Sequence, residues 1–91
     1  MSVKLAGIEF DRVVYDGKGD VLYLHVGDPA SGADWDESAE GDGVVYGSDG
    51  SLIGLTILNA RRRVEREGKI VVTLPSLRIE ADELAAVLAP V

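Results

Sequence analysis

The sequence predicts an α+β fold: a small antiparallel β-sheet of about five strands, with a short helix and a C-terminal amphipathic helix. Alternating apolar residues are broken by short Asp/Gly turns, a pattern typical of β-hairpins. These hairpin signals come before any strong helical pattern, which is the order of an α+β protein. The chain has 91 residues, of which 46% are apolar, so we expect one domain over residues 1–91.

The first strand is expected over residues 8–15, which open with the alternating apolar positions of Ile-Glu-Phe. Residues 16–20 then form a tight turn in which Gly17 and Gly19 supply positive φ angles at little cost.

The second strand, residues 21–26, is expected to point Leu22 and Leu24 into the core and Tyr23 and His25 to the opposite face. After it, residues 27–42 are rich in Asp, Gly and Ser and contain no base, which predicts a loop.

A second hairpin is expected from residues 43–47 and 52–58, joined by the Ser-Asp-Gly turn at 48–50. Gly54 lies in the middle of the fourth strand, which predicts a bulge or a close backbone neighbour there.

A short helix is expected over residues 60–67, with Asn59 as N-cap and Gly68 at its end. Two arginine–glutamate pairs have helical i,i+4 spacing: Arg61 with Glu65, and Arg63 with Glu67.

The chain is expected to end with one strand and one helix. Residues 69–74 form the fifth strand, which Pro75 terminates or places at a sheet edge. Residues 81–89 resemble an amphipathic helix, with Leu84, Val87 and Leu88 on one side.

The residue types argue against an enzyme. The chain has no cysteine and its only histidine is His25, so a zinc site and a catalytic triad lack their usual groups. The N-terminal residues are not expected to form a signal peptide, and no apolar stretch is long enough to span a membrane. Absence of cysteine is typical of a reducing compartment, so we expect a cytoplasmic protein.

The acidic segment from Asp34 to Glu37 opens like a calcium loop. The pattern then fails, because Ala39 stands where the turn needs glycine and Val45 where a bidentate glutamate is needed. The glycines fit no phosphate-loop spacing. We therefore expect no metal, no cofactor and no catalytic residue.

Net charge is −7 and it is uneven: residues 1–50 carry −8 and residues 51–91 carry +1. A negative field repels phosphate backbones, so general nucleic-acid binding is not expected. The same field would steer a basic protein partner toward the chain. Solubility alone is the simpler explanation of this charge.

Several side chains are candidates for binding. Trp35 is interpreted first as a plug folded back on the core and otherwise as an exposed contact residue. Arg62 lies in the only basic cluster, interpreted as a solvated helix. A possible cleft in the sheet would be lined by Tyr15, Tyr23 and His25. The remaining candidates are three carboxylates, Asp16, Asp20 and Glu40.

The ordered combination of Asp20-Val21-Leu22-Tyr23, Glu40 before Gly43-Val44, and Gly54-Leu55-Thr56-Ile57-Leu58 resembles the prokaryotic domain of unknown function 2283 family. The resemblance covers about residues 15–60. Thr56 departs from it, because an acidic residue is usual there. The resemblance implies a compact β-sheet domain without an established activity, and a role as partner of a small toxin-like protein.

Two functions from different classes follow. One is a protein-interaction module, in antitoxin-like form occluding a basic partner through a sheet edge or the C-terminal helix. The alternative is a small-molecule or anion-binding domain without catalysis, using a cleft lined by Tyr15, Tyr23 and His25. We also expect a homodimer, because the face of Tyr23 is semi-apolar and the strand at 70–74 offers an unpaired edge.

Overall fold

The computed structural model describes residues 2–28, 32–81 and 84–88. Every strand pairing is antiparallel, and the largest sheet has five strands, so the predicted class is confirmed in its main features. The elements in chain order are β1 (Val3–Leu5), β2 (Ile8–Phe10), β3 (Arg12–Asp16), β4 (Val21–His25), β5 (Asp34–Glu37), β6 (Gly43–Tyr46), β7 (Leu52–Leu58), α1 (Ala60–Glu67), β8 (Ile70–Thr73), β9 (Arg78–Ala81) and α2 (Ala85–Leu88).

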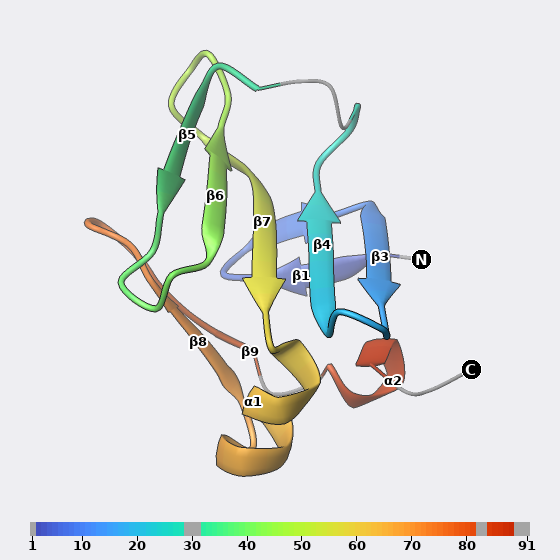
Figure 1. Cartoon of the computed structure of the whole chain (residues 1–91). Coiled ribbons are helices and arrows are strands. Elements are labelled where there is room, and N and C mark those ends of the chain that lie inside the picture. The colour runs from blue at the N-terminus through green and yellow to red at the C-terminus, as the bar shows by residue number, and fades with distance from the viewer. Residues whose placement is uncertain (1, 29–31, 82–83, 89–91) are drawn as a thin grey trace.

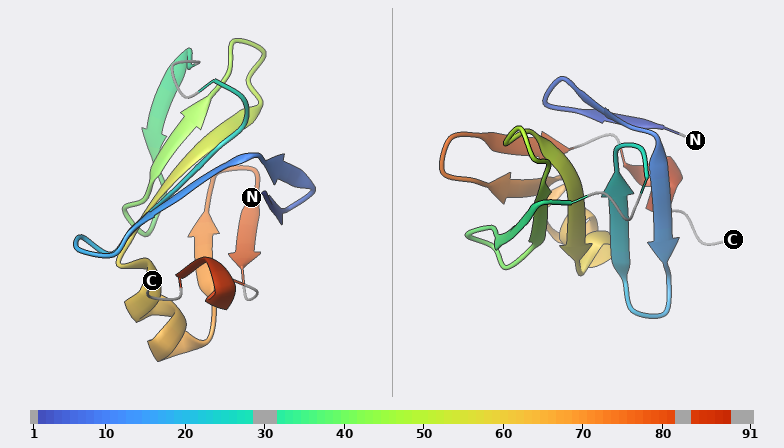
Figure 2. Two further views of the ribbon diagram at one scale, coloured as in Figure 1. Left: turned by 90° about the vertical axis from the view of Figure 1, so that its right-hand side faces the viewer. Right: turned by 90° about the horizontal axis from the view of Figure 1, so that it is seen from above.

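The main sheet has the strand order β3-β4-β7-β6-β5 (Figure 1). The hairpins β1–β2 and β8–β9 form two separate sheets, and both lie on the same side of the main sheet (Figure 2). We call this covered side the inner face and the opposite side the outer face.

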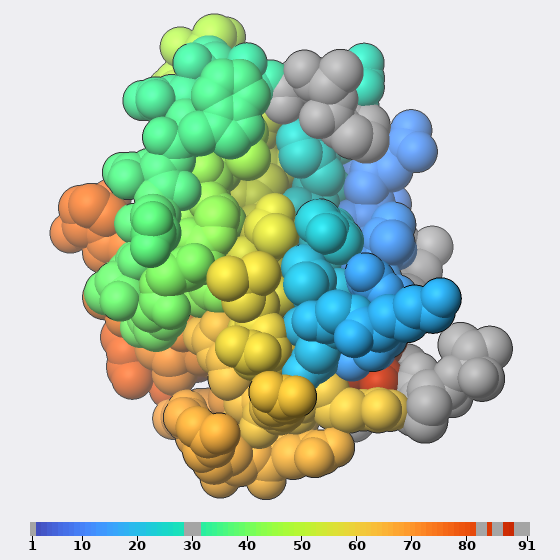
Figure 3. All heavy atoms as spheres, in the orientation of Figure 1, coloured from blue at the N-terminus to red at the C-terminus, as the bar shows by residue number. Residues whose placement is uncertain are grey.

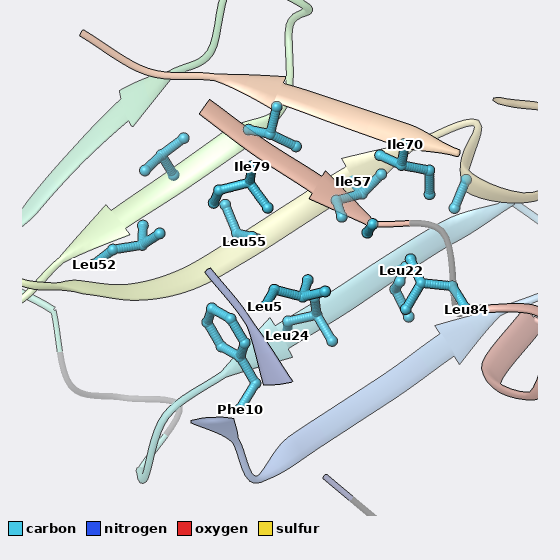
Figure 4. Packing of buried hydrophobic residues seen from close by; sticks show 14 of the residues in the cluster. Leu5, Phe10, Leu22, Leu24, Leu52, Leu55, Ile57, Ile70, Ile79 and Leu84 are labelled. Atoms are coloured by element: carbon cyan, nitrogen blue, oxygen red, sulfur yellow. The ribbon is translucent and has the colours of Figure 1, made fainter. Parts of the chain in front are cut away.

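The core lies between the inner face and the two hairpins. As predicted, Leu22 and Leu24 of β4 point into it and are almost completely buried. Figure 4 shows side chains from the sheet, both hairpins and the segment before α2 meeting in one cluster. Its largest buried members are Phe10, Leu22, Leu24, Leu55, Ile57, Ile70, Ile79 and Leu84.

The N-terminal hairpin was not expected. The chain breaks at Asp11, so the predicted first strand becomes β2 and β3. The turn between β1 and β2 uses Ala6 and Gly7, both at positive φ. Alanine is rare at positive φ, so the usual two-residue hairpin signal is missing from the sequence.

The acidic segment in the predicted loop 27–42 forms a strand, and residues 29–31 of that loop lie outside the described residues. Strand β5 pairs with β6 from Asp34–Tyr46 to Glu37–Gly43. All four of its residues are exposed. A strand at the edge of a sheet tolerates such a polar composition because it does not have to bury either of its faces.

The fifth strand, expected over residues 69–74, is shorter and is not part of the main sheet. Strand β8 pairs with β9 from Ile70–Ala81 to Thr73–Arg78 and not with the main sheet. Pro75 lies in the turn between them, where the Leu74 N–H donates to the Leu77 carbonyl at 2.8 Å.

The predicted amphipathic helix over residues 81–89 is not formed over that range. Ala81 ends strand β9, and α2 is a single turn from Ala85 to Leu88. Residues 82, 83 and 89 lie outside the described residues. The alternation of buried Ile79 and Ala81 with exposed neighbours explains why this part pairs as a strand. No helix in the described part of the chain could cross a membrane.

Candidate interaction surface

The outer face of the main sheet carries four exposed large apolar side chains, Val14, Tyr23, Leu58 and Trp35. Strand register aligns Val14, Tyr23 and Thr56 across β3, β4 and β7. The neighbouring row ends in Trp35 on β5, which pairs with Val45 on β6. Exposed fractions are 60% for Val14, 45% for Tyr23, 43% for Leu58 and 66% for Trp35. Figure 3 views the molecule from this side, which the five strands of the sheet form.

Trp35 is not a hydrophobic plug, so the preferred interpretation of its role was wrong. As part of an edge strand, it points to the outer face beside Val45 and remains largely exposed. On the same strand, Glu37 shares the face of Trp35, whereas Asp34 and Asp36 alternate onto the opposite face. A large exposed aromatic side chain on an acidic edge strand fits a contact residue for a basic surface.

Gly54 sits in the middle of this face. A register shift beside it agrees with the expected bulge, whereas its close neighbours are side chains and not the backbone that was the alternative expectation. The pairing of β6 with β7 shifts register between Val45 and Tyr46, opposite Gly54. A Cβ atom on Gly54 would lie 2.9 Å from Cδ2 of His25 and 3.1 Å from Cβ of Val45. The missing side chain lets these two neighbours close over the strand.

The predicted cleft of Tyr15, Tyr23 and His25 does not form. Tyr23 and His25 alternate onto the outer face, whereas Tyr15 packs against the core from the inner side. Asp16 ends β3 on the outer side and accepts a hydrogen bond from the Lys18 N–H at 3.1 Å, so it serves the turn. Of the predicted site residues, the structure therefore places Tyr23, His25 and Trp35 on the outer face, together with Asp16 at the end of β3.

Asp20, the last residue of the β3–β4 turn, caps helix α1. Its carboxylate accepts hydrogen bonds from the N–H groups of Arg61 at 2.7 Å and Arg62 at 3.2 Å, and from the Tyr15 hydroxyl at 2.7 Å. Its backbone carbonyl accepts the Ala60 N–H at 3.1 Å. The expected cap, Asn59, instead takes a left-handed conformation and makes no side-chain cap bond.

The same contacts set two pKa values. Burial would raise the pKa of Asp20, but the hydrogen bonds from Arg61, Tyr15 and Arg62 outweigh it and the pKa lies below the ordinary 3.8. The hydrogen bond to Asp20 raises the pKa of Tyr15 above 10.0. In the turn itself, positive φ falls on Asp20 at 55°, so the prediction for Gly17 and Gly19 was wrong.

Glu40 holds the edge of β8. Its carboxylate accepts the Thr73 N–H at 2.8 Å and the Thr73 hydroxyl at 2.7 Å. Burial would raise the pKa of Glu40, yet these bonds lower it below 4.5. Since the Thr73 carbonyl also accepts the Ala39 N–H, this part of the β8 edge is already paired and does not have the unpaired groups expected of it.

Arg62 lies exposed on α1 and lines a groove of about 360 Å³ with Glu40, Leu58 and Arg66. Glu67 lines the same groove, so both signs of charge are present. Arg62 is thus an exposed residue of α1, which agrees with its interpretation as part of a solvated helix.

Sequence reasoning missed one interaction, between Asp42 and Arg63. The Arg63 guanidinium donates to Asp42 at 2.7 Å, to the Leu58 carbonyl at 3.1 Å and to the Val71 carbonyl at 2.8 Å. Arg63 therefore joins β7 and β8 rather than pairing with Glu67 as expected. The expected pair of Arg61 and Glu65 is present at 3.9 Å.

Comparison with known proteins gives one match. The family model described as Protein of unknown function (DUF2283) matches residues 12–61, from the start of β3 to the first turn of α1. No curated protein and no solved structure matches the chain. Asp20, Glu40 and Gly54, three positions of the sequence resemblance, all serve contacts that hold this fold together.

Proposed function

The chain belongs to the DUF2283 family, and we propose that it is a protein-interaction module without catalytic activity that binds a basic protein on the outer face of its main sheet. The observation that carries this proposal is the exposure of Val14, Tyr23, Leu58 and Trp35 on one sheet face that none of the described elements covers. Large apolar side chains exposed on one face of a domain fit an interaction site.

Charge supports the choice of a basic partner. Strand β5 carries three carboxylates, of which Glu37 shares the face of Trp35, and the first fifty residues carry a net charge of −8. Complementary charge accelerates encounter and disfavours acidic competitors, while the aromatic side chains contribute contact area.

An antitoxin-like role is the specific form of this function that we propose, in line with the family resemblance. In that role the outer face covers the working surface of a small basic toxin. The cysteine-free composition supports a reducing compartment, and we propose the cytoplasm.

Small-molecule binding has less support. Tyr15 and Tyr23 lie on opposite faces of the sheet, so they do not line a common cleft as expected. The groove beside Arg62 contains carboxylates as well as arginines, which weakens its attraction for anions.

Photo-crosslinking in the host cell tests the proposal. A photoreactive amino acid replaces Tyr23 in one variant and Lys4 in a matched control, because Lys4 is exposed on β1 away from the outer face. We expect a basic protein to be captured from position 23 and not from position 4. Trp35→Ala should then weaken binding of the purified protein by roughly tenfold to a hundredfold, because interface tryptophans contribute strongly. Unchanged affinity in both Trp35→Ala and Tyr23→Ala would rule out this face.

A further inference from the structure

The main sheet ends in two strands of opposite character, β5 and β3. At β5, the carboxylate of Asp34 accepts the N–H of Trp35 at 3.0 Å, and that of Asp36 accepts the N–H of Glu37 at 2.8 Å. The side chains of β5 thus occupy backbone N–H groups at its free edge. Its negative charges would also repel β5 of a second copy. Strand β5 is protected against strand addition.

At the free edge of β3, the backbone N–H and C=O groups of Val13 and Tyr15 point outward, away from β4. The Val26 N–H donates to the Ile53 carbonyl of β7 at 2.8 Å. Residues 22, 24 and 26 therefore direct their backbone hydrogen bonds toward β7. Residues 21, 23 and 25 therefore bond toward β3, and their register partners on β3 bond back. In the described ranges 2–28, 32–81 and 84–88, no hydrogen bond reaches the outward groups of Val13 and Tyr15. The left view of Figure 2 faces this edge.

The side chains of β3 are self-complementary about Val14. Arg12, Val14 and Asp16 alternate onto the outer face, and all three are exposed. If a second β3 runs antiparallel with Val14 opposite Val14, each Arg12 lies opposite an Asp16 of the second copy. The same register places Val13 opposite Tyr15, whose outward groups then exchange hydrogen bonds.

We propose that two copies of this chain pair through their β3 strands, antiparallel and centred on Val14, to form one continuous sheet. Opposite charges at the two ends of β3 fix this register, and a shift by two residues would place Val14 opposite a charged residue. The interface lies at the far edge of the sheet from Trp35 and shares Val14 with the proposed partner surface, but its backbone pairing does not require a basic partner.

Disulfide crosslinking tests the register directly, because the chain has no natural cysteine. In the proposed pair the two Val14 residues form a pair without mutual hydrogen bonds, with Cα atoms about 4.5 Å apart. That separation falls within the roughly 4.4–6.8 Å that a disulfide spans. Val14→Cys should form a covalent dimer under mild oxidation, and the matched control Lys4→Cys, on exposed β1, should stay monomeric.

A charge exchange provides a second, reversible readout in the non-oxidised protein. Light scattering should give the wild type a mass of twice 9.7 kDa. Arg12→Asp should raise the dimer dissociation constant about tenfold or more by facing two carboxylates. The double variant Arg12→Asp with Asp16→Arg should restore the dimer, and Lys4→Asp, with the same change in net charge, should leave it intact.

Three results would overturn the proposal. The first is a wild type that remains at 9.7 kDa at a concentration of about 100 μM, the weak end of homodimer affinities. The second is a dimer that Arg12→Asp does not weaken. The third is failure of Val14→Cys to crosslink in a protein that is dimeric by mass, which would place the interface elsewhere.

Discussion

The guanidinium of Arg63 lies 2.7 Å from the carboxylate of Asp42, a side chain with no exposed surface in a domain of 91 residues. Asp42 also accepts the N–H of Leu58 at 3.1 Å, and its own N–H donates to the Ser38 hydroxyl at 3.0 Å. This contact ties the segment before β6 to helix α1. It supports the sheet from one end and leaves the outer face open.

Removing one member of this ion pair should destabilise the protein strongly. Asp42→Asn leaves the Arg63 charge partly buried without its counter-ion, which costs about 3–5 kcal/mol in other proteins. Urea unfolding measures the change in free energy. The exposed pair of Arg61 and Glu65 is the control, and Glu65→Ala should cost only about 0–0.5 kcal/mol. A loss for Asp42→Asn as small as the control would contradict a supporting role for the pair.

Acid should weaken the protein through Asp20 and Glu40. Both have pKa values lowered in the folded state, so their stabilisation is present above the ordinary values of 3.8 and 4.5 and is lost as pH falls through the folded values. The free energy of unfolding should therefore decrease below about pH 4.5. In the variant Asp20→Asn with Glu40→Gln, the protein should be less stable at pH 7 and its stability should depend less on pH in this range. An unchanged acid dependence would show that other carboxylates determine it.

The hydrogen bond from Tyr15 to Asp20 should be measurable separately. Tyr15→Phe removes the hydroxyl and keeps the ring in the core, so we expect a loss of about 1.5–3 kcal/mol, typical of a bond to a charged acceptor. Tyr23→Phe is the matched control, since its hydroxyl belongs to an exposed residue of the outer face. Equal losses in the two variants would argue against the role of Tyr15 in holding the cap.

Gly54 should tolerate no side chain. Gly54→Ala places a Cβ atom 2.9 Å from His25 and 3.1 Å from Val45, and overpacking of this kind costs about 1–3 kcal/mol. At Gly17 the nearest atom to a new Cβ is 3.9 Å away, so Gly17→Ala is the control. Thermal unfolding should show a lower midpoint for Gly54→Ala alone; a matching midpoint for both variants would contradict close packing at Gly54.

The parts of the fold with local signals could be predicted from the sequence. The strands around residues 21–26 and 52–58 alternate cleanly, and Gly68 ends α1 at a φ of 76°. Segments whose structure depends on distant partners were missed. Strand β5 reads as an acidic loop until it pairs with β6, and Ala81 reads as helical until it pairs with β8.

The candidate surface was only partly predictable for the same reason. Alternation places Tyr23 and His25 on one face, but the exposure of Trp35 depends on a strand that the composition hides. Asp20 and Glu40 were recognised as candidates, yet their partners Arg61 and Thr73 are 41 and 33 residues away along the chain. No spacing rule links residues at such separations.

Trp35 fluorescence tests the central claim, that the outer face binds a basic protein, most directly. Trp35 is the only tryptophan and is 66% exposed in the free protein, so its emission reports on this face alone. In a titration with the captured partner, made free of tryptophan, burial should shift the emission to shorter wavelength and protect it from acrylamide quenching. The shift should saturate at the stoichiometry found by calorimetry. A partner that binds by calorimetry but leaves both the emission and the quenching of Trp35 unchanged would contradict the account.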